Sequence, residues 1–143
     1  MKVGKKVVYF ICTGNSARSQ MAEGFAKALG ADIFEVYSGG TNPKGLNPYA
    51  VEVMKEAGID ISGQTSDPID PSVLKRCCLV ITLCGDARDN CPVIPPGVEH
   101  RHWPLEDPAA AVGGREEILK IFRETRDEIK RLVEDLVEEF RSV

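Results

Sequence analysis

Apolar runs and amphipathic segments alternate along the chain, and the two patterns predict different elements. Val7–Ile11 is apolar at every position, and Leu79–Leu83 is apolar except at Thr82. Continuous runs of this kind are typical of strands buried on both faces, as in a parallel sheet. Ile33–Tyr37 and Val98–Trp103 are more mixed, and we interpret them as two further strands.

Helical signals occupy the segments between and after these strands. The first predicted helix begins near Ser19 and ends at Gly30, a good helix stop. Asn47 and Asp70 are each followed by a proline, which is the order of a helix cap and a first helical residue. A long amphipathic helix is predicted from 115 to 141. Its expected buried stripe consists of Ile118, Phe122, Thr125, Ile129, Leu132, Leu136 and Phe140.

This alternation predicts an α/β fold: a four-stranded parallel sheet with helices on both faces. With 143 residues, the chain is long enough for one domain with its own core, and we expect a single domain over residues 1–143. Ligands of such folds bind at the carboxyl ends of the strands. Two of the predicted strands run directly into a cysteine there, Cys12 and Cys84.

Composition narrows the classes of function. The formal net charge is -4, which argues against general nucleic-acid binding. The early apolar run is too short for a secretory or membrane segment, so we expect a cytoplasmic protein with no membrane partner. The five cysteines are then expected to be catalytic, metal-binding or inert rather than structural disulfides.

The segment from Cys12 to Ser19 joins a predicted strand to a predicted helix, and its residues suit an oxyanion. Such a loop offers free backbone N–H groups and the positive end of a helix dipole. Gly14 permits tight curvature, and Arg18 adds planar donors that fit a tetrahedral oxyanion. The same environment stabilises a thiolate at Cys12. Ser19 is placed to hydrogen-bond the sulfur.

A resemblance to a known family begins at this loop. The segment CTGNSARSQMAEG resembles the phosphate-binding loop shared by low-molecular-weight protein tyrosine phosphatases and the thioredoxin-coupled arsenate reductases of the same fold. The resemblance extends to YSGGTNPKGLNPYAVEVMKEAGIDIS, TSDPID, LVITLCGDARDNCP and HWPLEDPA. It implies a low-molecular-weight phosphatase-like fold. It also implies an oxyanion-binding loop formed by Thr13, Gly14, Asn15, Ser16, Ala17, Arg18 and Ser19.

Extra cysteines separate the two branches of this family. Reduction of arsenate to arsenite consumes two electrons, so a second thiol must displace the product and close a disulfide. Cys84 and Cys91 resemble the second and third thiols of the reductases. The implied relay passes from the nucleophile Cys12 to Cys84 and then to Cys91, and thioredoxin reduces the final disulfide. No tightly bound cofactor is implied, and we expect a monomer.

Asp107 matches the family's general acid, which would protonate the oxygen that leaves as Cys12 attacks. Some reductases of this family also bind a potassium ion near the loop. The matching positions here all bear oxygen and suit a hard cation: Asn15, Glu23, Ser38, Thr65 and Asp67. Gln64 stands where some members have histidine.

Two alternatives remain open from the sequence. A low-molecular-weight phosphatase would hydrolyse phosphate monoesters through a Cys12 phosphoenzyme, although Ala109–Ala111 offers no aromatic platform for a phosphotyrosine ring. A non-catalytic oxyanion-binding or arsenic-sensing protein would bind without turnover. We expect Cys77 and Cys78 to be packing residues. His100 and His102 are too far from any CxxC pair to indicate zinc.

Overall fold

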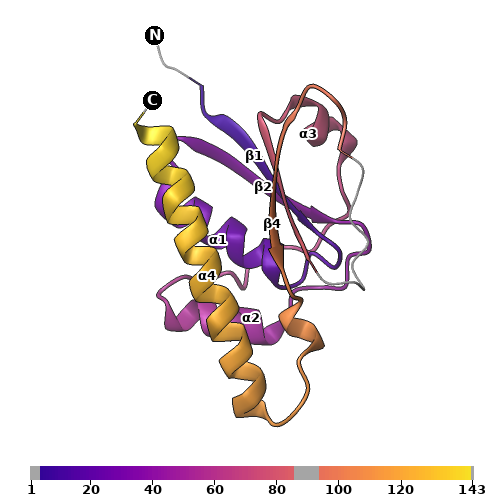
Figure 1. Ribbon diagram of the computed structural model, residues 1–143, viewed down its shortest axis with the longest axis vertical. Coiled ribbons are helices and arrows are strands. Elements are labelled where there is room, and N and C mark those ends of the chain that lie inside the picture. The colour runs from indigo at the N-terminus through magenta and orange to yellow at the C-terminus, as the bar shows by residue number, and fades with distance from the viewer. Residues whose placement is uncertain (1–3, 86–93, 143) are drawn as a thin grey trace.

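The computed structural model describes residues 4–85 and 94–142, and four parallel strands form its centre (Figure 1). The predicted α/β class is therefore confirmed. In chain order the elements are β1 Lys6–Cys12, α1 Arg18–Gly30, β2 Phe34–Gly40, α2 Pro48–Glu56, α3 Pro71–Arg76, β3 Leu79–Cys84, β4 Glu99–Leu105, the 3-10 helix η1 Pro108–Ala110 and α4 Arg115–Arg141.

The strand order is β2-β1-β3-β4, which makes the two cysteine-ending strands direct neighbours. Ile11 of β1 lies opposite Thr82 of β3, and the pairing between β3 and β4 shifts register between Thr82 and Cys84. Because all strands are parallel, their carboxyl ends share one edge of the sheet. The loop after β1 and the segment after β3 both begin at that edge.

Helices cover both faces of the sheet, as the alternating pattern predicts. Helices α1, α2 and α4 lie on one face, where alternate β1 and β3 residues such as Phe10 and Ile81 join the larger core (Figure 1). The short helix α3 covers the other face through Val73, which packs with Tyr9 and Val80. In the described part of the chain, no helix is long and apolar enough to span a membrane.

The predicted helix starts at Asn47 and Asp70 are confirmed by hydrogen bonds. The Asn47 carboxamide accepts from the backbone N–H of Tyr49 at 2.8 Å, and the Asp70 carboxylate accepts from that of Ser72 at 2.9 Å. The Asp70 N–H in turn donates to the Tyr9 hydroxyl at 2.8 Å, and burial raises the pKa of Tyr9. This contact fastens α3 to the sheet.

Two expectations about burial are met only in part. Phe122, Ile129 and Leu136 of the expected stripe of α4 are buried, and Ile118 and Phe140 pack partly buried against the core. The buried face is wider than the stripe, since Leu119, Val133 and Val137 are also buried. A core-facing helix buries a face broader than a single line of residues. Cys78 is exposed and is not a packing residue, whereas Cys77 is buried as expected.

Gly40 at the end of β2 allows β2 to lie directly against the loop that follows β1. A Cβ atom at this position would lie 2.6 Å from the carbonyl oxygen of Thr13 and 2.9 Å from the backbone nitrogen of Asn15. Both contacts are with backbone atoms, which cannot rotate away as a side chain could. The loop and the end of β2 therefore fit together only when position 40 lacks a side chain.

We predict that Gly40→Ala destabilises the protein by about 1–3 kcal/mol, the usual cost of inserting one methyl group into a packed site. Urea unfolding followed by circular dichroism measures the change. Gly63→Ala is the matched control, since a Cβ at position 63 would meet nothing within 4 Å. Equal stability of Gly40→Ala and the control would contradict the close approach.

Candidate active site

The loop between β1 and α1 turns its carbonyl groups from Cys12 to Ser16 outward. Each carbonyl oxygen from Cys12 to Ser16 accepts a hydrogen bond from outside the loop, with donor–acceptor distances of 2.8 to 3.4 Å. The donors, in the order of the carbonyls, are the backbone N–H groups of Thr41, Asn42 and Lys44, the side-chain amide of Gln20 and the backbone N–H of Asn47.

The outward carbonyls determine where the N–H groups of the loop point. In a trans peptide the C=O and the following N–H point in opposite directions, and the chain has no cis peptide among its described residues. The N–H groups of residues 13–17 are therefore turned to the inner side, where α1 also begins. A nest of amides at a helix N-terminus is a ready site for a tetrahedral anion. This geometry agrees with the predicted oxyanion loop.

Cys12 lies at the start of this loop, and its sulfur is hydrogen-bonded to the Ser19 hydroxyl at 3.0 Å. The Asn15 amide group donates to the Ser19 hydroxyl at 2.7 Å. Because the hydroxyl accepts this bond through a lone pair, its own hydrogen is available for the Cys12 sulfur. The Asn15 carbonyl oxygen accepts from the Asp67 N–H at 2.8 Å, which excludes the flipped amide. Asn15 and Ser19 thus form a hydrogen-bonded chain that ends at the Cys12 sulfur.

The same Asn15 amide extends the network away from the loop. Its second hydrogen goes to the Ser38 hydroxyl at 3.0 Å. Ser38 donates to the carboxylate of Glu23, which is also paired with the ammonium of Lys27. Asn15, Glu23 and Ser38 of the predicted potassium site are thus in one hydrogen-bonded chain. Thr65 and Asp67 lie beside it, and the Thr65 hydroxyl donates to the Asp67 carboxylate at 2.7 Å.

Two glutamines support the loop, and sequence reasoning did not assign them a role there. The buried Gln20 amide donates to the carbonyls of both Asn15 and Thr65, each at 2.9 Å. The Gln64 amide donates to the Gln20 side-chain and backbone oxygens at 2.8 and 3.0 Å. The available signal in the sequence was a polar residue in the first turn of α1, directly before the apolar Met21.

Arg18 is almost fully buried, with 2% of its surface exposed. Its Nη1 donates to the carbonyl oxygen of Leu105 at 2.9 Å and to that of Leu83 at 3.3 Å. Its Nη2 lies 3.8 Å from the Asp107 carboxylate. One guanidinium therefore joins the oxyanion loop to the ends of β3 and β4 and to the predicted general acid.

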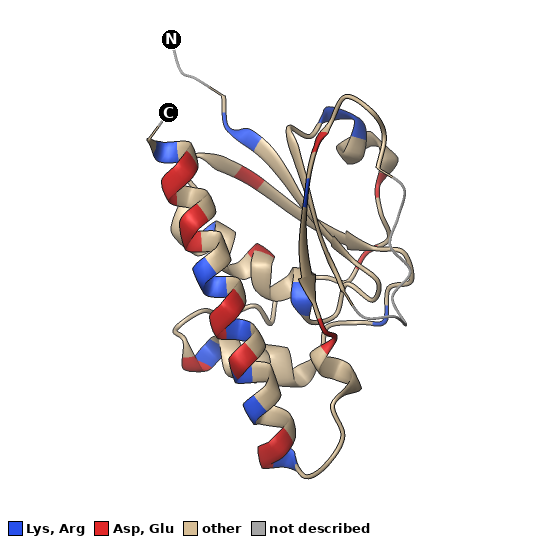
Figure 2. Ribbon diagram, in the orientation of Figure 1, with Lys and Arg blue, Asp and Glu red and all other residues tan. Residues whose placement is uncertain are grey.

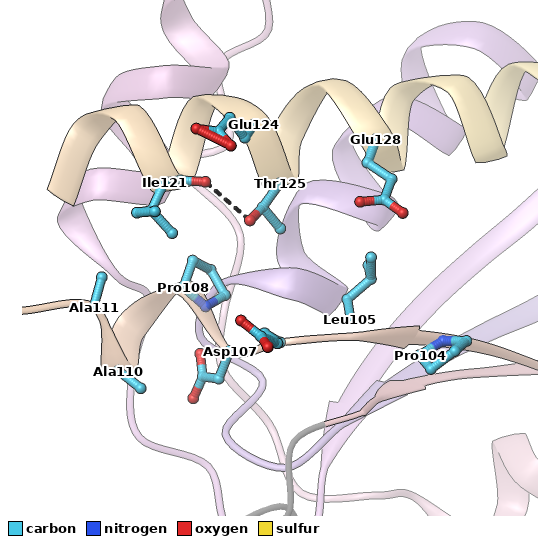
Figure 3. Close-up of a pocket in the computed structure, with 11 residues that line it drawn as sticks. Pro104, Leu105, Asp107, Pro108, Ala110, Ala111, Ile121, Glu124, Thr125 and Glu128 are labelled. Carbon is cyan, nitrogen blue, oxygen red and sulfur yellow. Dashed lines mark hydrogen bonds between the residues drawn. The ribbon is translucent and has the colours of Figure 1, made fainter. Parts of the chain in front are cut away.

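The Asp107 side chain points away from α4 (Figure 3), and its carboxylate is the one that lies 3.8 Å from Arg18 Nη2. One carboxylate oxygen accepts from the Ala109 N–H at 3.0 Å, and this bond caps η1. A cavity of about 460 Å³ lies on the α4 side of this segment. The described residues that line it include four carboxylates, those of Glu106, Asp107, Glu124 and Glu128, and no basic side chain. Four acidic side chains and no basic one make this cavity unfavourable for an anion.

Cys84 ends β3 at the same edge of the sheet at which Cys12 ends β1. The register pairs Ile11 of β1 with Thr82 of β3, so Cys12 lies one residue and Cys84 two residues beyond this pair on adjacent strands. The pairing of β3 with β4 is irregular at this point, between Thr82 and Cys84. The condition that the sequence set for the two cysteines, neighbouring strands, is therefore met.

The states of the cysteines differ. Cys12, Cys77 and Cys78 are free thiols, whereas Cys84 is disulfide-bonded. Burial raises the pKa of the Cys77 thiol, which disfavours the nucleophilic thiolate there. Cys91, the predicted third thiol, lies outside the described residues.

Both histidines of the chain bind one buried hydroxyl. The Thr82 hydroxyl lies 2.9 Å from a ring nitrogen of His100 and 2.7 Å from one of His102. Among residues 4–85 and 94–142, no group of three or more His, Cys, Asp or Glu side chains is arranged to hold a metal ion.

Comparison with known proteins identifies the class to which this fold and loop belong. The low molecular weight phosphotyrosine protein phosphatase family matches residues 7–142, and the chain belongs to that family. Within it, an arsenate reductase of Bacillus licheniformis is 55% identical over 136 residues, which are 95% of this chain and 98% of the relative. An arsenate reductase of Bacillus subtilis is 54% identical over 133 residues, 93% and 96% of the two chains.

Solved structures agree with this assignment. An arsenate reductase in a phosphate-binding state has a TM-score of 0.79 at 42% identity, covering 94% of this chain and 98% of that one. A thioredoxin-dependent arsenate reductase of Corynebacterium glutamicum has a TM-score of 0.68 at 30% identity, covering 94% of this chain and 63% of that one.

We predict that Ser19→Ala and Asn15→Ala both slow the alkylation of Cys12 by iodoacetamide at neutral pH, by about tenfold. One hydrogen bond to a charged group contributes about 1.5 kcal/mol or more, which corresponds to this factor. The Cys12 peptide is quantified by mass spectrometry. Ser62→Ala, at an exposed position, is the control. Unchanged alkylation in Asn15→Ala would show that Asn15 does not orient the Ser19 hydroxyl.

Proposed function

We propose that this protein reduces arsenate to arsenite through a relay of three thiols that thioredoxin regenerates. The observation that carries the proposal is the placement of Cys84 on the strand beside Cys12, at the edge where the amide nest binds an oxyanion. A phosphatase needs only the nest, Cys12 and an acid. The second thiol at this edge is what the reduction requires.

In the first step, the Cys12 thiolate attacks the arsenic atom of arsenate held by the loop N–H groups and Arg18. A sulfur–arsenic bond forms, and one arsenate oxygen leaves as water with a proton from Asp107. The Cys84 thiolate then attacks the Cys12 sulfur. A disulfide forms as the sulfur–arsenic bond breaks, and its electron pair stays on arsenic, which departs as arsenite.

In the last steps, the Cys91 thiolate attacks Cys84 and releases Cys12 as a thiolate. Thioredoxin reduces the Cys84–Cys91 disulfide and supplies the two electrons. The disulfide-bonded state of Cys84 beside a free Cys12 supports this order, because Cys12 must be free again before the next arsenate binds. The curated relatives and the thioredoxin-dependent relative support the same substrate and electron donor.

We expect Cys12→Ser, Cys84→Ser and Cys91→Ser each to lose arsenate turnover by more than about 100-fold, because each residue makes or breaks a bond. A coupled assay with thioredoxin, thioredoxin reductase and NADPH measures turnover. Cys78→Ser, which alters an exposed free thiol, is the control and keeps its activity.

Phosphatase activity separates this proposal from its alternative. Cys84→Ser is expected to keep any hydrolysis of p-nitrophenyl phosphate, since that reaction needs only Cys12 and the acid. Efficient phosphate ester hydrolysis together with no arsenate-dependent NADPH oxidation in the wild type would identify a phosphatase. Oxyanion binding with neither activity would identify a binding protein.

We also propose a potassium site near the oxyanion loop. Its ligands would come from Asn15, Glu23, Ser38, Thr65 and Asp67. The oxygens of Glu23, Ser38 and Asp67 have the chemistry for a hard cation. The Lys27 ammonium, however, already neutralises Glu23. The ion would therefore strengthen a network that the protein also holds by itself.

We expect Lys27→Gln to gain more thermal stability from KCl than the wild type gains, because potassium then becomes the only cation beside Glu23. A ligand that binds only the native state raises stability with its concentration. Melting temperatures in KCl and in NaCl at equal ionic strength provide the measurement. Identical melting temperatures in the two salts, for both proteins, would exclude the site.

A further inference from the structure

Gln20 is a buried polar side chain behind the oxyanion loop. It lies in the first turn of α1, and 0% of its surface is exposed. Its amide nitrogen donates to the backbone carbonyls of Asn15 and Thr65, each at 2.9 Å. Its side-chain oxygen accepts from the amide of Gln64 at 2.8 Å. Both amide hydrogens and the side-chain oxygen of Gln20 therefore have partners.

These partners allow the Gln20 amide only one orientation. Backbone carbonyls can only accept, so the amide nitrogen rather than the oxygen must face Asn15 and Thr65. The Gln64 amide also donates to the backbone oxygen of Gln20 at 3.0 Å, and so holds both its side chain and its backbone. A rotated amide would set its oxygen against two carbonyl oxygens, and buried polar groups without partners are costly. Gln20 is thus a fixed donor, and Gln64 keeps it in place.

The Asn15 carbonyl belongs to a peptide of the amide nest. Its C=O group and the N–H of Ser16 point in opposite directions, as in any trans peptide. Gln20 binds the carbonyl from the outer side of the loop, which turns the Ser16 N–H to the inner side. The other carbonyls from Cys12 to Ser16 accept from backbone N–H groups, whereas the donor to this one is a side chain. The direction of one N–H of the nest therefore depends on a group that a substitution can remove.

The backbone of Asn15 needs such support. Its φ of 44° is left-handed, and a residue other than glycine persists in this region only where its surroundings fix it. The Asp67 N–H fixes the Asn15 carboxamide, and Gln20 fixes the Asn15 backbone carbonyl. The second bond of Gln20, to Thr65, ties both restraints to the same segment, residues 65–67. Loss of Gln20 removes the restraint on the carbonyl and lets the loop leave its binding conformation.

We propose that Gln20 is a positioning residue for oxyanion binding, which holds the peptide between Asn15 and Ser16 with its N–H turned into the nest. A loop that adopts this conformation only part of the time binds an anion more weakly in the same proportion. A bound anion itself restores the conformation, so loss of Gln20 raises KM and leaves kcat nearly unchanged. The proposal rests on the oxyanion loop of the proposed function, but not on the identity of the anion as arsenate.

The test measures oxyanion binding without turnover, in sodium buffers free of potassium. Inorganic phosphate in the loop protects Cys12 from alkylation by iodoacetamide, and the concentration for half-protection gives its Kd. Gln20→Met keeps the length of the side chain and loses its donors. We expect it to raise the Kd about tenfold, the effect of a binding conformation that is populated about a tenth of the time. Gln20→Glu keeps the shape but lacks both amide hydrogens, and is expected to raise the Kd at least as much.

Kinetics and a second variant separate positioning from general damage. In the coupled arsenate assay, Gln20→Met is expected to raise KM by the same factor as the phosphate Kd and to change kcat less than about twofold. Gln64→Met leaves the two carbonyl bonds of Gln20 but removes the group that holds its amide. We expect it to raise the phosphate Kd by a smaller factor, about threefold, the contribution of one ordinary hydrogen bond.

Val137→Ala is the matched control for stability. Val137 is buried beside Gly30, at the far end of α1 from the loop, so its truncation lowers the melting temperature and leaves the phosphate Kd unchanged. An unchanged Kd in Gln20→Met overturns the proposal, and so does an equal rise in Val137→Ala. If neither Gln20 variant folds, an unchanged Kd in Gln64→Met overturns it. Normal phosphate protection with no arsenate turnover in the wild type would overturn the proposed function, whereas the role of Gln20 in anion binding would stand.

Discussion

The carboxamide of Asn15 is the contact on which the rest of the site depends. Its oxygen accepts from the Asp67 N–H, which leaves both amide hydrogens for Ser19 and Ser38. That single orientation connects Asn15 through Ser19 to the Cys12 sulfur and through Ser38 to Glu23. Asn15 also has a φ of 44°, a left-handed conformation that asparagine tolerates better than most residues. One residue thus contributes both to the shape of the loop and to the hydrogen bonds that surround the thiol.

The sequence was sufficient for the fold wherever local signals decide the structure. Continuous apolar runs identified β1 and β3, and the Asn-Pro and Asp-Pro steps located the starts of α2 and α3. The buried face of α4 was predicted in part: Phe122, Ile129 and Leu136 are buried as expected, whereas the burial of Leu119 depends on how the helix packs against the sheet. The order of the strands also depends on tertiary packing and was not predicted. From the sequence, the two cysteines were expected to lie close together only if their strands were neighbours.

The candidate site likewise has a part that the sequence predicted and a part that it did not. The amide nest, Cys12, Arg18 and Ser19 follow from a strand–loop–helix pattern, because the free N–H groups of a helix start are a local property. The donors that turn the loop carbonyls outward come from residues 41–47 and from Gln20, and no local rule connects these to the loop. Gly40 shows the same limit. A methyl group at this position would clash with backbone atoms of Thr13 and Asn15, and these atoms are its neighbours only in the folded structure.

Arg18 has a second structural role beyond its charge. Its Nη1 donates to the carbonyl of Leu83, the residue directly before Cys84, and to the carbonyl of Leu105 on the neighbouring strand. Cys84 is the last residue of β3, so the peptide that Arg18 holds is the one that carries the second thiol of the proposed relay. The guanidinium beside the oxyanion loop therefore also restrains the end of the strand that bears this thiol. One buried side chain thus links the proposed oxyanion site to the proposed second thiol.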